Sequence, residues 1–388
     1  MDSGTAVVIG GGIGGLAAAI GLRRIGWTVT VVERAPVLDD AGAGISLAAN
    51  GLRALDALGV GAAVRGAARG QYTGGTRTPD GRWLARMDGA ALERALGTPI
   101  VGIPRADLHR LLRAELPAAA LLVGVEASAV EPARSGGGPL LVRAGGRELP
   151  ADLVVAADGL HSRTRRVLFP SHPGPAYSGS TVLRAITERP VEAAGDFELT
   201  WGRGAEFGHI MFADGRAEWH AVLNAPAGHR YPDPLAELRH RFRDWHHPIP
   251  ALLAATAPEA VLHHDVNELA TPLPGYVRGR VALLGDAAHA MTPNLGQGAC
   301  QALEDAAVLA AAVAGAPSVE RALLRYDAER RPRTQAVARA ARQAGRLGQQ
   351  LAHPAAVAVR NAVLRLAPSG VAVQAILRHA DWTAPRVG

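Results

Sequence analysis

The sequence predicts an α/β protein in which a parallel sheet with crossover helices is joined to an antiparallel sheet and followed by C-terminal helices. A strand, a glycine-rich loop, a helix and a second strand follow one another in residues 5–33, as at the start of a parallel sheet. Apolar strands near 153 and 281 also end in short loops. Between them, residues 178–223 alternate in polarity and are rich in Trp, Phe and His, as expected of an antiparallel sheet.

The elements follow from local patterns. Asp214-Gly215 stands between two alternating runs and predicts a hairpin turn. Apolar residues at helical spacing, begun or ended by Pro and Gly, predict helices. The expected strands lie at 5–10, 27–34, 151–159 and 279–290, and the expected helices at 15–26, 48–60, 104–116, 234–245 and from about 318 onward.

The composition excludes several classes of protein. The 388 residues are enough for one large or two medium domains with a substantial core. Cys300 is the only cysteine, which excludes an internal disulfide, a CxxC pair and a cysteine-based metal cluster, and we expect a reducing cytoplasm. The sequence has no lysine, which excludes Schiff-base lysine chemistry and a Walker phosphate loop.

The charge and the hydropathy limit the partners. A net charge of +6, with arginines such as Arg163, Arg165 and Arg166 and no interleaved aromatics, is interpreted as an exposed arginine-rich surface and not as a nucleic-acid site. No uncharged apolar run is long enough to span a membrane, and the N-terminus lacks the pattern of a signal peptide. We expect a cytoplasmic monomer or homodimer.

The first loop carries the pattern G-x-G-x-x-G in Gly10, Gly12 and Gly15. In such a loop, the glycines permit a tight turn, an approach of the backbone to a pyrophosphate and close packing of helix on strand. Glu33 ends the next strand, where a carboxylate accepts hydrogen bonds from ribose hydroxyls. The motif predicts a Rossmann-like dinucleotide site and leaves FAD and NAD open.

A second strand end favours FAD. Asp286 follows the strand near 281, and a loop with Pro293 and Gly296-Gln297-Gly298 then opens a helix. A flavin dinucleotide is long enough to need a second anchor, and an Asp there can accept from a ribityl hydroxyl. The free N–H groups of the helix start would stabilise negative charge on the reduced ring.

These fingerprints resemble a known family. The glycine loop, "AADGLHSRTR" at 156–165 and the "GD" stretch with its "P-x-x-G-Q-G" tail occur in the order found in group A FAD-dependent monooxygenases, the p-hydroxybenzoate hydroxylase type. The salicylate hydroxylase, urate hydroxylase and zeaxanthin epoxidase branch is the most similar. The segments at 42–59 and 103–112 are also similar to that family, and the resemblance covers about residues 6–342.

The resemblance implies a set of FAD contacts along the chain. It places Arg105 near the ribityl and phosphate region, Ala127 near the adenine, and Asp158-Gly159 beside the pyrophosphate and the NAD(P)H. The implied cofactor-binding residues are Gly10, Gly12, Gly15, Glu33, Arg34, Gly44, Ile45, Arg105, Ala127, Asp158, Gly159, Asp286, Pro293, Gly296, Gln297, Gly298 and Ala299.

The family reaction is implied in the same way. NAD(P)H would reduce the FAD, and O₂ would be captured as a flavin C4a-hydroperoxide that hydroxylates or epoxidises a small aromatic or otherwise electron-rich substrate. A FAD-dependent reductase or dehydrogenase without oxygen transfer and a non-catalytic flavin-binding relative are the alternatives. A flavin halogenase is excluded because that chemistry relies on a lysine.

The substrate residues are expected on the antiparallel sheet. His220, then His209, are candidates for the base that deprotonates a ring hydroxyl, and Pro293 is counted with them because it lies beside the flavin. Within the resembled family, some relatives carry a pocket His at the position of Ser46 and many carry an Arg at that of Glu206, and these departures argue against a carboxylate-bearing substrate. The expected substrate pocket comprises Ser46, Trp201, Met211, Trp219 and His220.

The domain organisation is expected to be discontinuous. Residues 1–75, 101–175 and 271–345 would form the FAD-binding domain. Residues 76–100 and 176–270 would form the substrate-binding antiparallel-sheet domain, and residues 346–388 the C-terminal helices. No metal is expected.

Overall fold

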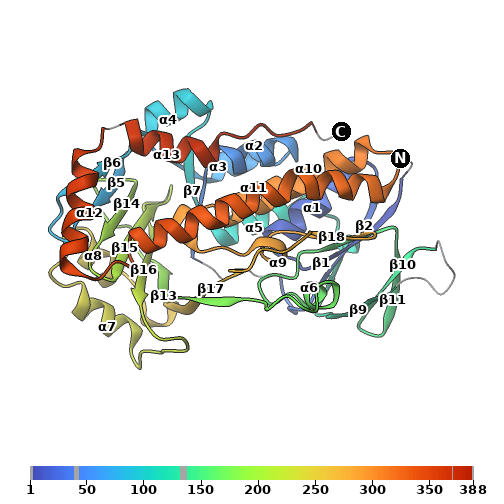
Figure 1. Ribbon diagram of the computed structural model, residues 1–388, viewed down its shortest axis with the longest axis horizontal. Helices are drawn as coiled ribbons and strands as arrows, with labels where there is room; N and C mark the ends of the chain where they lie inside the picture. The colour runs from blue at the N-terminus through green and yellow to red at the C-terminus, as the bar shows by residue number, and fades with distance from the viewer. Residues whose placement is uncertain (1–2, 39–42, 132–137, 369, 387–388) are drawn as a thin grey trace.

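The computed structural model describes residues 3–38, 43–131, 138–368 and 370–386. Over these residues the chain forms sheets of six, seven, three and three strands. Figure 1 shows the six-stranded sheet and the seven-stranded sheet at opposite ends of an elongated molecule, with α11 (Val319–Leu347) running between them. The predicted combination of a parallel sheet, an antiparallel sheet and C-terminal helices is confirmed.

The six-stranded sheet has the order β18-β19-β12-β1-β2-β8. Its pairings are parallel except that of β18 with β19. The strands β12 and β19 at its centre are entirely apolar and buried, and helices and a small sheet cover the two sides of the sheet. The strands are β1 (Thr5–Ile9), β2 (Thr28–Glu33), β8 (Leu121–Val123), β12 (Leu153–Ala156), β18 (Val277–Arg278) and β19 (Val281–Leu283).

One face of this sheet packs on the main helical layer. The core between them is built from small and branched apolar residues, which lets α1 approach α10 closely. The helices of this part are α1 (Ile13–Arg24), α2 (Ala49–Ala57), α3 (Gly61–Ala67), α4 (Gly89–Leu96), α5 (Arg105–Ala114), α6 (Arg163–Leu168), α9 (Asp286–His289) and α10 (Gly298–Gly315).

The other face is covered by the small sheet β11-β10-β9. Its strands are β9 (Ala127–Glu131), β10 (Leu140–Ala144) and β11 (Arg147–Ala151). A second small sheet, β3-β7-β4, lies between the two large sheets. Its strands are β3 (Gly44–Leu47), β4 (Arg69–Gln71) and β7 (Ile100–Pro104).

The seven-stranded sheet has the order β17-β13-β16-β15-β14-β5-β6 and is antiparallel except where β14 meets β5. The predicted turn at Asp214-Gly215 joins β15 to β16, and Gly215 has a φ of 81° there. The strands are β5 (Gly74–Arg77), β6 (Trp83–Arg86), β13 (Ala176–Ile186), β14 (Phe197–Trp201), β15 (Ala205–Met211), β16 (Ala217–Asn224) and β17 (Leu262–Glu268).

A separate core covers the outer face of this sheet. Trp219, Phe207 and Phe242 pack there beneath α7 (Pro234–Arg241) and α8 (Ile249–Ala254), with the rings of Phe207 and Trp219 stacked at 5.6 Å. The chain ends in α12 (Pro354–Leu366) and α13 (Gly370–Ala380), so the C-terminal helices are also confirmed. The expected division of the chain into domains remains a prediction.

α10 is the one helix in the described part of the chain that is long and apolar enough to cross a membrane. Most of it is buried inside the protein, where it packs against α1, α2 and α11. It also carries the buried acids Glu304 and Asp305. These contacts identify α10 as a core helix of this fold.

Candidate active site

Three strand ends meet at one edge of the six-stranded sheet. β19, β12 and β1 are adjacent and parallel, so the loops that follow them emerge side by side. Gly10 directly follows β1, Asp158 lies two positions after the end of β12, and Asp286, three positions after the end of β19, begins α9. The strand order therefore brings the glycine loop and Asp286 to the same edge of the sheet, and their binding of one FAD stays a prediction.

The glycine loop is shaped by close backbone contacts. Gly10 has a φ of 107°, and a Cβ there would lie 2.3 Å from the carbonyl oxygen of Ala157. A Cβ on Gly15 would lie 1.9 Å from the carbonyl oxygen of Gly10, so that residue lets α1 pack on the turn. Gly12 differs, because a Cβ there would meet no atom within 4 Å. Gly10 and Gly15 thus permit the close backbone packing of this loop, whereas Gly12 borders open space.

Two side chains hold this loop from below. The Glu33 carboxylate accepts hydrogen bonds from the N–H groups of Gly11 at 2.7 Å and Ala35 at 2.8 Å. His109, which the sequence analysis does not single out, donates from Nε2 to the carbonyl oxygen of Gly11 at 2.7 Å. His109 is buried on the inner face of α5. The sequence feature that could have identified His109 is its position four residues after Arg105 in an amphipathic helix.

Only one of the two carboxylate oxygens of Asp158 is hydrogen-bonded within the described part of the chain. Its Oδ2 accepts from the N–H of Thr164 at 3.1 Å, whereas its buried Oδ1 has no partner in the described part of the chain. Beside it, Arg165 donates to the carbonyl oxygens of Leu160 at 2.6 Å and Ala287 at 3.0 Å. Burial lowers the pKa of Arg165, although the Asp158 charge opposes this shift. The interpretation of Arg165 as an exposed surface charge is wrong, because its guanidinium ties the β12 loop to α9.

The second anchor is a helix start that side chains leave open. α10 begins at Gly298 with no side-chain cap and no acid in its first turn. A Cβ added at Gly296 or Gly298 would meet nothing within 4 Å, and Pro293 is exposed. Gln297 points inward instead and accepts from the Asn50 amide at 2.8 Å. The first N–H groups of α10 therefore face open space, where an acceptor on a ligand can reach them.

The Asp286 loop rests on a buried ionic cluster. Asp305 accepts from the N–H of Gly285 at 3.0 Å, from His289 Nε2 at 2.6 Å and from Arg330 Nε at 2.7 Å. Burial alone would raise the pKa of Asp305, but His289 and Arg330 outweigh it and lower that pKa. The cluster fixes the backbone at Gly285, so the carboxylate of the next residue, Asp286, is left exposed at the edge of the cleft.

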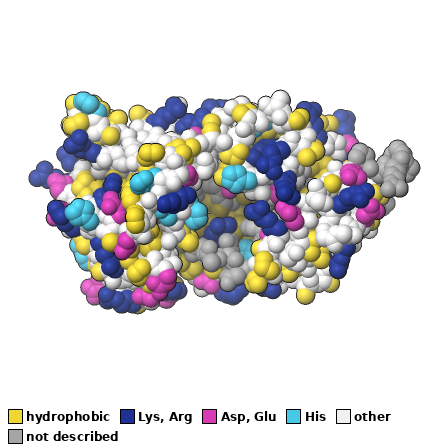
Figure 2. Space-filling view, turned by 90° about the horizontal axis from the view of Figure 1, so that it is seen from below, with side chains coloured by type: hydrophobic (Ala, Val, Ile, Leu, Met, Phe, Trp, Pro, Cys, Tyr) yellow, Lys and Arg dark blue, Asp and Glu magenta, His cyan; other side chains and the backbone are white. Residues whose placement is uncertain are grey.

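This arrangement fits FAD. α1 and α10 both present N-termini without side-chain caps or first-turn acids, as phosphate and flavin carbonyl groups require. Open space lies over Gly12 at one helix start and over Gly298 at the other. The unpartnered Oδ1 of Asp158 lies between the two anchors in the strand order. Figure 2 shows the surface hollowed near the middle of the long axis.

The remaining expected FAD contacts lie around this edge. Arg34 is exposed just after Glu33, and the open Gly159 follows Asp158. The N–H of Arg105 donates to the carbonyl oxygen of Ala43 at 3.2 Å, where β7 passes into α5. Ala127 begins β9 and packs against the apolar cluster beneath β1 and β2.

β3 contains Gly44 and Ile45, the expected contacts of the flavin ring, followed by Ser46. This strand lies against the seven-stranded sheet. A Cβ on Gly44 would lie 2.6 Å from Cβ of Glu218, so this strand packs directly on β16. Only glycine permits that approach. The face of the large sheet that bears Glu218 is therefore the face turned to β3.

Strand alternation divides the expected substrate residues between two faces. Cross-strand partners share a face, and the register places Trp201 and His220 with Glu206 and Glu218 on the face turned to β3. The same register places Trp219, Met211 and His209 on the opposite face, in the core under α7 and α8. The sheet does not bring these last three residues to the face turned to β3, because Trp219 is adjacent to His220, and Trp219 and Ala217 are the cross-strand partners of His209 and Met211.

His209 is also unsuited to proton transfer by its surroundings. It is 2% exposed, and its Nε2 lies 3.2 Å from the carbonyl oxygen of Gly195. Burial lowers the pKa of His209 to about 4. The imidazole is thus a neutral, hydrogen-bonded part of the core.

His220 stands between two buried carboxylates. Its Nδ1 lies 3.3 Å from Glu218 Oε2, and its Nε2 lies 3.9 Å from Glu206 Oε1. Burial alone would lower the pKa of His220, and Arg184 on β13 acts in the same direction, but the two carboxylates outweigh both and raise it. Burial raises the pKa of Glu206, against His220 and the indole N–H of Trp201, which donates to Glu206 at 2.5 Å.

Comparison with known proteins is consistent across the chain. Residues 4–341 match the family described as FAD binding domain. The chain is 38% identical over 348 residues to the aurachin C monooxygenase/isomerase of Stigmatella aurantiaca, which covers 89% of this chain and 90% of that protein. It is 37% identical over 352 residues to the 3-amino-4-hydroxybenzoate 2-monooxygenase PtnB3 of Streptomyces platensis, which covers 87% of each.

A solved structure agrees with these relatives. Klebsiella pneumoniae HpxO complexed with FAD and uric acid superposes with a TM-score of 0.90 and 26% identity, over 98% of this chain and 97% of that chain. The relatives named above are monooxygenases, which supports oxygen transfer and not the reductase or the non-catalytic alternative. Since the family match spans the FAD edge, β3 and the sheet that faces it, the chain belongs to the group A FAD-dependent monooxygenases, flavoprotein oxidoreductases that use NAD(P)H and O₂.

Proposed function

We propose that this monooxygenase hydroxylates a small aromatic or otherwise electron-rich ring without a carboxylate, and that His220 accepts the proton of a ring hydroxyl. The observation that carries the proposal is the cluster of His220, Glu218 and Glu206 on the sheet face turned to β3. Two buried carboxylates on this face would repel an anionic substituent placed against them. A neutral ring with an acidic hydroxyl meets no such repulsion.

The FAD contacts are part of the proposal. Gly12 and the N-terminus of α1 would hold the pyrophosphate, Glu33 the ribose and Asp286 the ribityl chain. The start of α10 would face the flavin carbonyl edge, with Gly44 and Pro293 beside the ring. Bound FAD supplies the electrons taken from NAD(P)H and the activated oxygen. The chain's own residues orient the ring of the substrate, exclude water and take up the proton.

His220 is suited to this task by its neighbours. A ring hydroxyl that loses its proton makes the ring carbon more nucleophilic, and the imidazole that gains the proton becomes a cation. Glu218 and Glu206 stabilise that cation at short range. Replacement of His220 by Gln is expected to lower kcat by about 10²- to 10⁴-fold for a hydroxylated ring.

Glu218→Gln is expected to move the pH profile of kcat/KM. The neutral imidazole is the active form, so activity rises with pH through the pKa of His220, which the carboxylates hold above 6.5. Loss of the Glu218 charge lowers this pKa and shifts the ascending limb to lower pH. The matched control is Glu198→Gln, a buried acid on the opposite sheet face. A Glu218→Gln profile that coincides with the wild-type profile would contradict the role of His220.

A ligand screen tests the function itself. Purified holoenzyme is mixed with neutral phenols, with hydroxylated N-heterocycles and with 3-amino-4-hydroxybenzoate, the substrate named for the Streptomyces platensis relative. We expect the neutral rings to accelerate NAD(P)H oxidation and to gain one ¹⁸O atom from labelled O₂. Turnover of the benzoate with no turnover of neutral rings would refute the proposal. NMR spectroscopy of the product separates hydroxylation from epoxidation, because the two products have the same mass.

We also propose the expected division of the chain into a discontinuous FAD-binding domain, a substrate domain and C-terminal helices. The sheet memberships support it. A cytoplasmic location is supported by the single cysteine, Cys300, which is buried. Sedimentation analysis of the holoenzyme decides between the proposed monomer and homodimer.

A further inference from the structure

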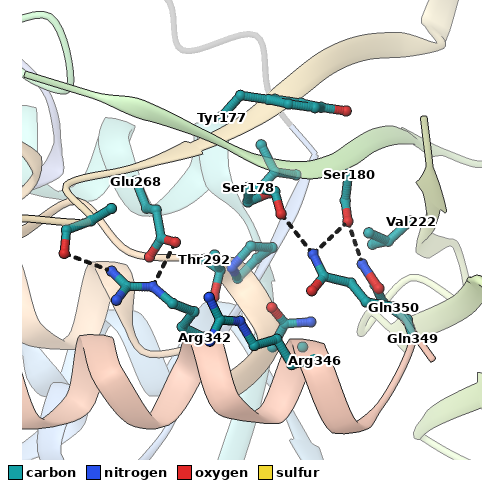
Figure 3. A pocket seen from close by; sticks show the side chains of 15 residues that line it. Tyr177, Ser178, Ser180, Val222, Glu268, Thr292, Arg342, Arg346, Gln349 and Gln350 are labelled. Atoms are coloured by element: carbon teal, nitrogen blue, oxygen red, sulfur yellow. Dashed lines mark hydrogen bonds and ion pairs between the residues drawn. The ribbon is translucent and has the colours of Figure 1, made fainter. Parts of the chain in front are cut away.

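A polar cavity of about 180 Å³ lies next to the proposed substrate site. Figure 3 shows it between β13 and α11, with side chains from both elements directed toward it. The loop that begins α10 forms another wall through Thr292, Pro293 and Asn294. The polar groups used below come from Ser178, Ser180, Glu268, Thr292, Arg346 and Gln349.

Four buried polar atoms around this cavity have no hydrogen-bond partner among the described residues. They are Oγ of Ser178, Oε2 of Glu268, Oγ1 of Thr292 and Oε1 of Gln349. Buried polar atoms of folded proteins are nearly always paired, and an unpaired one costs stability. Four at one cavity therefore indicate a site whose partner is a ligand.

Two of the side chains that carry these atoms, and the backbone at Ser178, are held in place by other bonds. Arg342 donates to Oε1 of Glu268 at 2.7 Å, and Gln349 donates to Ser180 at 2.7 Å. Gln350 donates to the carbonyl oxygen of Ser178 at 2.8 Å. The side chains of Glu268 and Gln349 are thus held in position, which limits the rearrangement that they need to meet a ligand.

The cavity continues the sheet face that bears His220. Val222 stands two positions after His220 on β16, on the same face, and lines the cavity. Pro293, expected beside the flavin ring, lines the opposite side. A substrate held between Pro293 and His220 would therefore extend a substituent into this space.

The unpaired atoms define the chemistry of that substituent. Glu268 Oε2 and Gln349 Oε1 are acceptors and call for an N–H or O–H donor. The hydroxyls of Ser178 and Thr292 can donate, and Arg346, exposed at the rim, has no ion pair within the described residues. A group with an N–H next to a carbonyl satisfies both sets at once.

We propose that this cavity is a substrate subsite for an amide or lactam edge, in which an N–H donates to Glu268 or Gln349 and the carbonyl accepts from Ser178 or Thr292. The proposal rests on the proposed function, because it places the reacting ring between Pro293 and His220. It narrows the substrate class to neutral rings that carry such an edge.

The test uses a matched pair of ligands on the oxidised holoenzyme. 2(1H)-Quinolone carries the N–H and carbonyl edge, whereas coumarin has the same ring outline and carbonyl with a ring oxygen in place of the N–H and so has no donor. Titration followed by the FAD absorbance change gives both dissociation constants. We expect the quinolone to bind at least about tenfold more tightly, since loss of one donor leaves a buried acceptor unpaired. Equal affinities, or no binding of either ligand, would overturn the proposal.

Two variants test whether the preference for the quinolone arises from contacts in the cavity. Thr292→Val and Gln349→Met keep the side-chain volumes and are expected to reduce the preference for the quinolone by about fivefold or more. Thr98→Val is the matched control, because Thr98 is buried with an unpaired hydroxyl away from the cavity. The melting temperature is expected to be maintained in Thr292→Val, as in Thr98→Val. Unchanged selectivity in Thr292→Val and Gln349→Met would remove the subsite.

The same experiment separates the two proposals. An enzyme that prefers the quinolone but transfers no ¹⁸O to any ring would refute the proposed function and leave the subsite standing. An enzyme that hydroxylates neutral phenols but binds the two probes equally would refute the subsite alone.

Discussion

Gly12→Ala is expected to abolish stable FAD binding while the fold is retained. Gly12 has a φ of −73° and a ψ of 179°, which any residue adopts, and a Cβ there would meet no protein atom within 4 Å. The added methyl group would instead occupy the space where a pyrophosphate approaches the N-terminus of α1. We expect purified protein without yellow colour and an FAD affinity reduced by about 100-fold or more.

The measurement is titration of apoprotein with FAD, together with the melting temperature in the absence of FAD. Gly66→Ala is the control, because Gly66 also borders open space but lies on the surface of α3. It should bind FAD as the wild type does. Wild-type FAD affinity in Gly12→Ala would show that the open space over this loop is not the pyrophosphate site. A lowered melting temperature of the apoprotein would instead indicate a folding defect.

Arg330→Met is expected to lower the free energy of unfolding by about 3–5 kcal/mol. Arg330 is fully buried and donates to Asp305 at 2.7 Å, to Glu304 and to the side-chain oxygen of Gln301 at 2.7 Å. Its removal leaves the Asp305 charge in the core with only His289 to offset it, and Glu304 with only Arg333. Because Asp305 also holds the backbone N–H of Gly285, FAD affinity should fall with stability.

Urea unfolding followed by circular dichroism gives the stability change. The matched control is Arg331→Met on the same helix, whose partner Asp327 is partly exposed. A solvent-exposed pair of this kind contributes about 0–1 kcal/mol. If both variants lost the same small amount, the buried cluster would not be the support of the Asp286 loop.

The sequence predicts the cofactor edge well because its signals are local. The turn at Gly10, the close packing at Gly15 and the open start of α10 each depend on residues next to one another in the chain. Their meeting at one edge follows from the parallel order of β19, β12 and β1. His109 and Arg165 are missed for the opposite reason: each bonds to a loop that only the tertiary fold brings near.

The substrate side is harder to predict, because a strand's alternation states which residues share a face and not which face meets the cleft. Trp219 and His220 are adjacent and equally suitable by composition. The contact of Gly44 with Glu218 shows which of the two residues lies on the face turned to β3, and no sequence pattern within β16 predicts that contact. The cavity at Gln349 is likewise formed by separate pieces of chain that lie between Tyr177 and Gln350 in the sequence.

The length of α11 sets the distance between the ionic cluster and the cavity. Arg330 and Arg342 are 12 residues apart on this one helix, which is about 18 Å along its axis. A single inserted residue between them would rotate one end against the other by about 100° and displace it by about 1.5 Å. The number of residues between these two arginines is therefore fixed by geometry, even where the intervening side chains are free to vary.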